Sequence, residues 1–327
     1  MPDTGRSLED VANSPPQQTL AFMTNQVDGI VAQVGSIILG KERQIRLGLA
    51  CLLARGHLLI EDLPGVGKTM LAHALAASLG LGFQRIQFTS DLLPADILGV
   101  SIYDREAHGF QFHPGPIFTQ VVLADEVNRA TPRAQSALLE AMEEHQVTVE
   151  GETRRLPQPF FVIATQNPSH QVGTFSLPES QPDRFLMRIE LGYPDANAER
   201  ELLQGQDRRD LLESLPPSMD VMSLLDLQRR TRAVHASGAL LDYVQDIVRH
   251  TRRSSDYVNG LSPRAALALV HAARAWALMA GRDHVEPEDV QAVLPGVVGH
   301  RLVAAGHTAR VNGSDVAQHL IDQVPIP

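Results

Sequence analysis

The sequence predicts an α/β protein in which a parallel sheet flanked by helices is followed by a small all-α domain. Between residues 19 and 192 helical segments alternate with short apolar runs, which is typical of parallel sheets whose crossovers are helices. After residue 192 no apolar run of comparable strength appears, and helical spacing dominates. A third observation is local. Residues 58–79 combine a strand, a glycine-rich turn and a helix, a unit suited to binding phosphate.

The elements of the first region can be assigned in chain order. Helices are expected near 20–38, 42–55, 68–79 and 131–145, and strands at 58–60, 84–88, 119–124, 160–164 and 186–191. Two hairpins are expected, within 99–112 and within 146–158. Residues 90–117 contain several Gly and Pro and show no extended hydrophobic periodicity. An insertion of this length in a compact α/β domain is usually functional.

The second region shows the spacing of buried helix faces. One such face is formed by Leu240, Leu241, Val244, Ile247 and Val248. A helix is expected to begin at Ser262-Pro263 and to end at Gly281, and another to begin at Glu286-Pro287. We therefore expect three segments: a disordered tail at 1–18, an α/β core at 19–193 and an α-helical lid at 194–327.

Composition narrows the class of protein. The chain has 327 residues, of which 43% are hydrophobic and 20% charged, as in ordinary soluble domains. Its net charge is −10 and its basic residues are dispersed, which disfavours nonspecific nucleic-acid binding. The one cysteine, Cys51, lies in an apolar helical run and cannot form an internal disulfide. No apolar run approaches a membrane span, and the polar first 18 residues do not resemble a signal peptide, so we expect a cytoplasmic protein.

The turn after the first strand carries the most chemical information. It contains Gly65, Gly67, Lys68 and Thr69, close to the phosphate-binding pattern G-x-x-x-x-G-K-[ST], but Asp62 stands where that pattern has its first glycine. Lys68 is expected to reach the β- and γ-phosphates, and the Thr69 hydroxyl is expected to bind Mg²⁺. Only two of the 28 basic residues are lysines, Lys41 and Lys68. A compact ammonium fits a loop wrapped around phosphate better than a guanidinium does.

Two acids follow the second buried strand. Ligands sit at the carboxyl ends of parallel strands, so Asp125 and Glu126 are expected beside the phosphate loop. Asp125 is expected to hold Mg²⁺, through water, and Glu126 to polarise an attacking water. Two acids at a strand end also occur in plain solvated turns, but the loop about 55 residues upstream favours the catalytic interpretation.

Asn167 directly follows the strand 160–164. Its carboxamide could hydrogen-bond both the γ-phosphate and the attacking water, although asparagine before proline is also ordinary turn chemistry. The thirteen histidines show no metal-ligand spacing, and we interpret them as packing or surface residues.

Five sequence blocks together resemble the MoxR family of AAA+ ATPases. They are Leu-Ala-Asp-Glu-Val-Asn-Arg-Ala at 123–130, Gln-Ser-Ala-Leu-Leu-Glu-Ala-Met-Glu-Glu at 135–144, Ile-Ala-Thr-Gln-Asn-Pro at 163–168, Leu-Pro-Glu-Ser-Gln-Pro-Asp-Arg-Phe-Leu-Met at 177–187 and Leu-Ser-Pro-Arg-Ala at 261–265. The resemblance extends from about residue 20 to the end of the chain. An aspartate at position 62 is itself similar to what MoxR proteins carry.

The resemblance implies roles for individual residues. Asn167 resembles the sensor-1 residue, and Arg184 resembles the arginine finger that reaches a neighbouring subunit's γ-phosphate. Arg264 resembles the sensor-2 arginine, which the lid brings onto the nucleotide in cis. Arg184 could instead pair with Asp183 or Glu179 inside its own chain.

Further implied contacts concern the nucleotide and the ring. Residues 38–42, with Gly40 and Lys41, are expected to cover the adenine, and the loop contacts are expected from Pro64, Gly65, Val66, Gly67, Lys68, Thr69 and Met70. By resemblance, residues 90–117 and 146–158 face the ring pore. Two interpretations of Arg129 stay open: a second interface arginine, or a member of a surface ion pair.

The function implied by the resemblance is Mg²⁺-dependent ATP hydrolysis by a ring-forming protein, a hexamer. Such rings act as chaperone-like remodellers that mature or insert a metal into a client enzyme, often with a separate von Willebrand factor A-domain protein. The alternatives are a nucleic-acid motor of the same clade and a scaffold whose nucleotide only holds the oligomer together. A GTPase is disfavoured because the chain lacks Asn-Lys-x-Asp.

Overall fold

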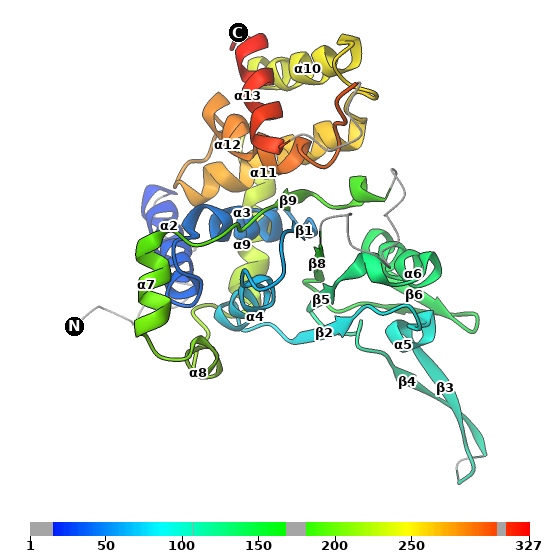
Figure 1. Cartoon of the computed structure of the whole chain (residues 1–327). Helices are drawn as coiled ribbons and strands as arrows, with labels where there is room; N and C mark the ends of the chain where they lie inside the picture. The colour runs from blue at the N-terminus through cyan, green and yellow to red at the C-terminus, as the bar shows by residue number, and fades with distance from the viewer. Residues whose placement is uncertain (1–15, 107, 168–180, 306–311) are drawn as a thin grey trace.

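The computed structural model describes residues 16–106, 108–167, 181–305 and 312–327 (Figure 1). Its centre is a parallel five-stranded sheet in the order β2-β5-β8-β1-β9. The strands are β1 (Leu58–Glu61), β2 (Phe83–Gln87), β5 (Val121–Asp125), β8 (Phe161–Gln166) and β9 (Met187–Ile189). The predicted α/β class is therefore confirmed. The tail predicted at 1–18 lies mostly outside the described residues, and the first described helix begins at Pro16.

Both faces of the sheet are buried, because alternate residues of each strand point to opposite sides. Leu58 and Ile60 belong to one apolar cluster, whereas Leu59 belongs to the other. The first cluster is covered by α2 (Pro16–Gly35), α3 (Glu42–Leu53) and α4 (Lys68–Ser78), and the second by α6 (Pro132–Glu144). Cys51 is fully buried in the first cluster, as its apolar surroundings predicted.

Two hairpins extend from the core, as predicted. The first pairs β3 (Gly99–Asp104) with β4 (Gly109–Pro114) and projects away from the sheet (Figure 1). The second pairs β6 (Gln146–Val149) with β7 (Glu152–Arg155). The sequence did not predict the short helix α5 (Pro94–Leu98), which begins at a proline in the first turn and leads into β3. Short 3-10 turns follow β5 (η1, Val127–Arg129) and precede β9 (η2, Pro182–Arg184).

The region after residue 194 is helical in its described parts, as predicted. Its helices are α7 (Ala196–Gln204), α8 (Arg208–Glu213), α9 (Val221–Ala233), α10 (Gly238–Arg253), α11 (Pro263–Met279), α12 (Pro287–Val298) and α13 (Gly313–Gln323). Ser262 caps α11, because its hydroxyl accepts from the Ala265 amide at 3.1 Å. None of the helices in the described ranges is long and apolar enough to cross a membrane.

The helical region shares its core with the α/β region. Helices α8 and α9 contact α4 and α3, α11 contacts α2 and α3, and α12 contacts β9. One continuous apolar cluster accordingly runs from Met23 on α2 to Val324 after α13. The division at residue 194 stays a prediction.

Candidate functional site

The phosphate loop connects β1 to the amino end of α4. Gly65 and Gly67 adopt φ of 87° and 96°, in the left-handed region where glycine has the least strain. Gly67 is the N-cap of α4, so no side chain caps the helix, and its first turn contains no acid. The first backbone N–H groups of α4 are therefore free to bind an anion, and a phosphate group fits this arrangement.

Lys68 opens α4 and is only 8% exposed. Its Nζ donates to the Asp62 carbonyl at 2.5 Å and to Asn167 Oδ1 at 2.8 Å. Burial lowers the pKa of Lys68 below its ordinary value, and the nearby carboxylates of Asp62 and Asp125 oppose this shift. The ammonium thus lies between the loop and the end of β8, where phosphates are expected to bind.

Asp62 fills the position at which the general pattern has glycine. Its Oδ2 accepts from the amides of Leu191 and Gly192 at 2.7 and 2.6 Å, and its Oδ1 accepts from the Leu63 amide at 2.7 Å. The carboxylate therefore fastens the phosphate loop to the segment that leaves β9. This structural role explains why an acid can replace the expected glycine.

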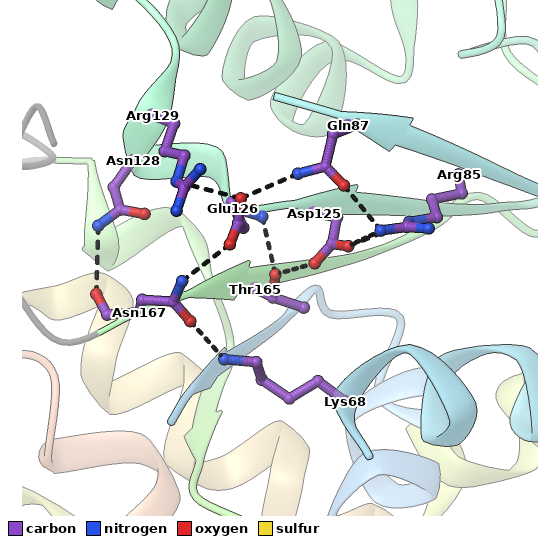
Figure 2. A network of polar contacts seen from close by, with 9 residues as sticks. All are labelled: Lys68, Arg85, Gln87, Asp125, Glu126, Asn128, Arg129, Thr165 and Asn167. Atoms are coloured by element: carbon purple, nitrogen blue, oxygen red, sulfur yellow. Dashed lines mark hydrogen bonds and ion pairs between the residues drawn. The ribbon is translucent and has the colours of Figure 1, made fainter. Parts of the chain in front are cut away.

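Glu126 and Asn167 meet at the carboxyl ends of β5 and β8 (Figure 2). Asn167 Nδ2 donates to Glu126 Oε1 at 2.9 Å, while Oδ1 of the same amide accepts from Lys68. Gln87 Nε2 and Arg129 Nε lie 3.0 and 3.1 Å from Glu126 Oε2. Glu126 has φ of 56°, a strained conformation for a residue with a side chain, and such strain is common at functional sites.

Asp125 has a second set of partners. Thr165 Oγ1 donates to its Oδ1 at 2.5 Å, and the Arg85 guanidinium donates to its Oδ2 at 3.0 and 2.6 Å. No group of three or more His, Cys, Asp or Glu that could hold a metal occurs in the described ranges. This donor set suits Mg²⁺, which retains several waters and binds through one or two carboxylates together with substrate phosphates. Asp125 and Thr69, the second residue of α4, would supply the protein oxygens.

Sequence reasoning missed four residues of this network: Arg85, Gln87, Asn128 and Thr165. Arg85 and Gln87 alternate along β2 and pair with Leu123 and Asp125 of β5. Arg85 also donates to Gln87 Oε1 at 2.7 Å, so β2 contributes a connected pair. The signal was present, because polar residues at alternate positions of a strand beside Asp125-Glu126 share one face of the sheet.

The loop before α3 lies beside the phosphate loop. Gly40 has φ of 68°, and Lys41 is buried with its Nζ donating to the Tyr193 carbonyl at 2.7 Å. A Cβ placed on Gly67 would lie 3.6 Å from Ile38 Cδ1. Of the other predicted loop contacts, Pro64 is exposed, whereas Val66 and Met70 pack against the core. These positions bring the predicted adenine cover next to α4.

Arg184 and Arg264 lie together, but at the other edge of the sheet. Arg184 Nη1 lies 2.9 Å from Glu143 Oε2 and donates to the Leu139 carbonyl at 2.8 Å. Arg264 Nη2 donates to the other carboxylate oxygen of Glu143 at 2.5 Å. The alternative partner Asp183 is instead bound by Arg301 and Ser262, and Glu179 lies outside the described residues.

This position corrects the expectation that Arg264 contacts its own chain's nucleotide. Arg184 shortly precedes β9, which pairs in parallel with β1, so Glu143 and both arginines lie at the amino edge. Lys68 lies beyond the carboxyl edge, and the four residues of β1 alone span about 13 Å. A cavity of about 270 Å³ at the amino edge is lined by Arg184, Arg264 and residues 54–57. Helix α11 therefore directs Arg264 away from the phosphate loop.

Comparison with known proteins agrees with the fold. The model of the family described as "ATPase family associated with various cellular activities (AAA)" matches residues 57–187, and the model of the "AAA lid domain" matches residues 249–321. The first match contains the phosphate loop, Asp125, Glu126, Asn167 and Arg184. The second contains Arg264.

Individual relatives extend the likeness to most of the chain. The uncharacterized protein YeaC of Bacillus subtilis is 48% identical over 84% of this chain and 85% of its own. Chaperone MoxR1 of Mycobacterium tuberculosis is 40% identical over 91% of this chain and 82% of its own. A crystal structure of a candidate ATPase from Cytophaga hutchinsonii has a TM-score of 0.85 at 33% identity and covers 95% of this chain and 98% of that one.

Proposed function

The chain belongs to the MoxR family of AAA+ ATPases, and from this membership we propose that it hydrolyses ATP to ADP and phosphate with Mg²⁺. The observation that carries the proposal is the amide of Asn167, which touches Lys68 with one atom and Glu126 with the other. An ammonium for phosphate and a carboxylate for water are thus held on the two sides of a single amide. Attack of water on a γ-phosphate needs both groups to be positioned beside the same phosphate.

Each side chain has a distinct role in the proposed reaction. The free N–H groups of α4 and the Lys68 ammonium bind the phosphates, and Asn167 orients the γ-phosphate and the water. Glu126 accepts a proton from the attacking water. Thr69 and Asp125 are the residues that would hold Mg²⁺, which would supply positive charge to the phosphates.

ATP binding should exchange some of the contacts of this network. We propose that Lys68 exchanges its bond to the Asp62 carbonyl for phosphate and that an oxygen of Glu126 accepts the attacking water. Gln87 and Arg129 donate to Glu126 Oε2, the carboxylate oxygen that Asn167 does not contact. We therefore assign Gln87 and Arg129 the role of positioning the Glu126 carboxylate.

The amino edge supports action on a second subunit. Arg184 and Arg264 share Glu143 and lie too far from their own phosphate loop, so both are proposed to serve a neighbour's nucleotide in a ring, a hexamer. Arginines supplied in trans raise phosphoryl-transfer rates by roughly 10³–10⁵. An isolated subunit should therefore bind nucleotide but hydrolyse it slowly.

The cellular role proposed is remodelling of client proteins. One relative is named a chaperone, and the two hairpins outside the sheet are available to transmit motion to a client. By family resemblance, the client is an enzyme that is matured or loaded with a metal, and a separate von Willebrand factor A-domain protein takes part. DNA-stimulated hydrolysis would instead indicate a nucleic-acid motor, and ring formation without turnover would indicate a scaffold.

Two substitutions test the chemistry directly. Lys68→Ala should abolish ATP binding at the phosphate loop, measured with a fluorescent analogue. Glu126→Gln should retain binding and lose roughly 10²–10⁴ in phosphate release, because general-base catalysis contributes about that factor. Glu213→Gln, an exposed carboxylate on α8, is the matched control and should behave as the unaltered protein. Normal phosphate release by Glu126→Gln would remove Glu126 as the base.

A further inference from the structure

A second basic cavity adjoins the one that contains Arg184 and Arg264. Its volume is about 320 Å³, and it is lined by Ala54, Arg55, His145, Thr231, Arg232, His271 and Arg274. Ala54, Arg55, His145 and His271 also line the first cavity, so the two are adjacent. The lining of the second cavity contains three arginines and two histidines but no acid.

Packed helices place these side chains around the cavity, where Arg55, Arg232, His145 and His271 are exposed and Arg274 is half-buried. Arg55 follows α3, Arg232 lies in the last turn of α9, and Arg274 is on α11. The buried Gln228 of α9 donates its Nε2 to the Leu52 carbonyl of α3 at 2.8 Å, which fixes the ends of these two helices together. Because the guanidiniums come from three mutually packed helices, the cavity is a built feature of the fold.

The three guanidiniums lack partners inside the chain. Among residues that the structure describes, the guanidiniums of Arg55, Arg232 and Arg274 have neither a hydrogen-bond acceptor nor a carboxylate partner, and Arg274 Nε is buried without one. Burial and then the positive charge of Arg232 lower the pKa of Arg55. Burial and then Arg274 and Arg232 lower the pKa of His271. The neighbours in this cavity therefore repel one another.

Two local features reinforce this conclusion. Arg55 has φ of 58° just after α3, a conformation in which glycine has the least strain. An arginine therefore occupies this helix end at a cost in backbone strain. Helices α3, α6 and α9 end here, and each end contributes about −0.5 charge. Their sum of about −1.5 accommodates the arginines, but it does not neutralise three guanidiniums.

We propose that this cavity binds an oligophosphate anion at a site separate from the phosphate loop. The planar guanidinium matches phosphate oxygens with paired hydrogen bonds, and three of them fit a ligand with several charges. The volume suits a small ligand, and no lining side chain offers an aromatic face of Phe, Tyr or Trp for a base. The ligand is an inorganic oligophosphate or the phosphate chain of a nucleotide.

The test titrates sodium tripolyphosphate into the full-length Lys68→Ala chain by calorimetry, so that the phosphate loop does not compete. One saturable site per chain is expected. Arg232→Ala and Arg274→Gln should each weaken binding by about tenfold or more, because each removes a charged hydrogen-bond donor. Arg229→Ala is the matched control on α9, since Arg229 is 74% exposed and pairs with Asp226. It should change the affinity by less than about twofold.

A parallel titration with ATP in the same background distinguishes the sources. Binding of ATP with the same arginine dependence identifies the phosphate chain of a nucleotide, and binding of tripolyphosphate alone identifies an inorganic anion. Absence of saturable binding overturns the proposal, as does an equal loss in Arg229→Ala. The proposal also fails if Arg232→Ala weakens association between chains and leaves tripolyphosphate binding unchanged. None of these readouts depends on hydrolysis, so failure here leaves the proposed ATPase chemistry standing.

Discussion

The two edges of the sheet differ in how their charges are satisfied. At the carboxyl edge, Lys68, Asn167 and Glu126 bind one another, and Asp125 is held by Arg85 and Thr165. At the amino edge, Arg184 and Arg264 share a single carboxylate, and three more arginines nearby have no described partner. The first edge is electrostatically nearly complete, whereas the second has an excess of positive charge.

This difference indicates that the edges serve different ligands. The network at the carboxyl edge is satisfied within one chain, so a nucleotide only has to replace some of the contacts of that network. Unpaired guanidiniums near a protein surface keep their hydration until an anion arrives, so they are suited to a ligand from outside the chain. Within the proposed ring, the nucleotide held by one chain's carboxyl edge is a ligand for Arg184 and Arg264 of the next chain, and the proposed oligophosphate is a ligand for the three unpaired arginines.

The largest expected effect separates the two edges. Arg184→Ala should lower turnover by roughly 10³–10⁵ and leave nucleotide affinity nearly unchanged, because the arginine is absent from its own chain's site. Steady-state phosphate release and nucleotide titration provide the two measurements. Arg209→Ala, an exposed arginine on α8, is the control and should change neither quantity. Equal losses of affinity and turnover in Arg184→Ala would place this arginine at the carboxyl edge.

An intermediate effect concerns the stability of the amino edge. His57 is buried, its Nδ1 accepts from the Val162 amide at 3.0 Å, and its Nε2 lies 3.1 Å from the Met142 carbonyl, so the neutral ring fits. Burial lowers the pKa of His57 to about 4. Because the unfolded pKa is about 6.5, the unfolded chain binds the proton first, and stability present above pH 6.5 falls by up to about 3 kcal/mol towards pH 4.

Urea unfolding at several pH values measures this dependence. His57→Gln should be less stable at neutral pH and should show a flatter decline below about pH 6.5. His108→Gln, at an exposed position of the first hairpin, should retain the full decline. An unchanged decline in His57→Gln would assign the pH dependence to other groups.

The smallest expected effect lies at the carboxyl edge. Asp62→Asn keeps the shape of the side chain but weakens its hydrogen bonds to the amides of Leu63, Leu191 and Gly192. We expect a loss of about 1 kcal/mol in the free energy of unfolding, the usual scale for weakening charged hydrogen bonds. Asp242→Asn, exposed on α10, should cost less than about 0.5 kcal/mol. Equal stability of the two variants would show that Asp62 does not fasten the loop.

The sequence predicted the carboxyl edge better than the amino edge. Strand ends in a parallel sheet converge by topology, so Lys68, Asp125, Glu126 and Asn167 could be placed together from their positions after strands. Both hairpins and the all-helical region also followed from periodicity and turn residues. Arg85 and Gln87 were missed because the short strand β2 was examined for apolar residues rather than for its polar face.

The amino edge depends on how α11 packs against the core, and periodicity does not encode that orientation. The sequence showed that Arg264 begins a helix, but not that this helix directs the side chain to Glu143 of α6. Likewise, Arg55, Arg232 and Arg274 are separated by up to 219 positions in the chain. Only the packing of α3, α9 and α11 brings them to one cavity.

The most direct test of complementary edges mixes two inactive variants. Lys68→Ala lacks the phosphate ligand but keeps Arg184, whereas Arg184→Ala keeps the phosphate loop. In an equal mixture that assembles at random, about a quarter of the sites combine an intact loop with a neighbour's Arg184, so ATP hydrolysis should reappear. A mixture of Arg184→Ala with the Lys68→Ala, Arg184→Ala double variant should stay inactive. Mixed oligomers that form and yet release no phosphate would contradict the account.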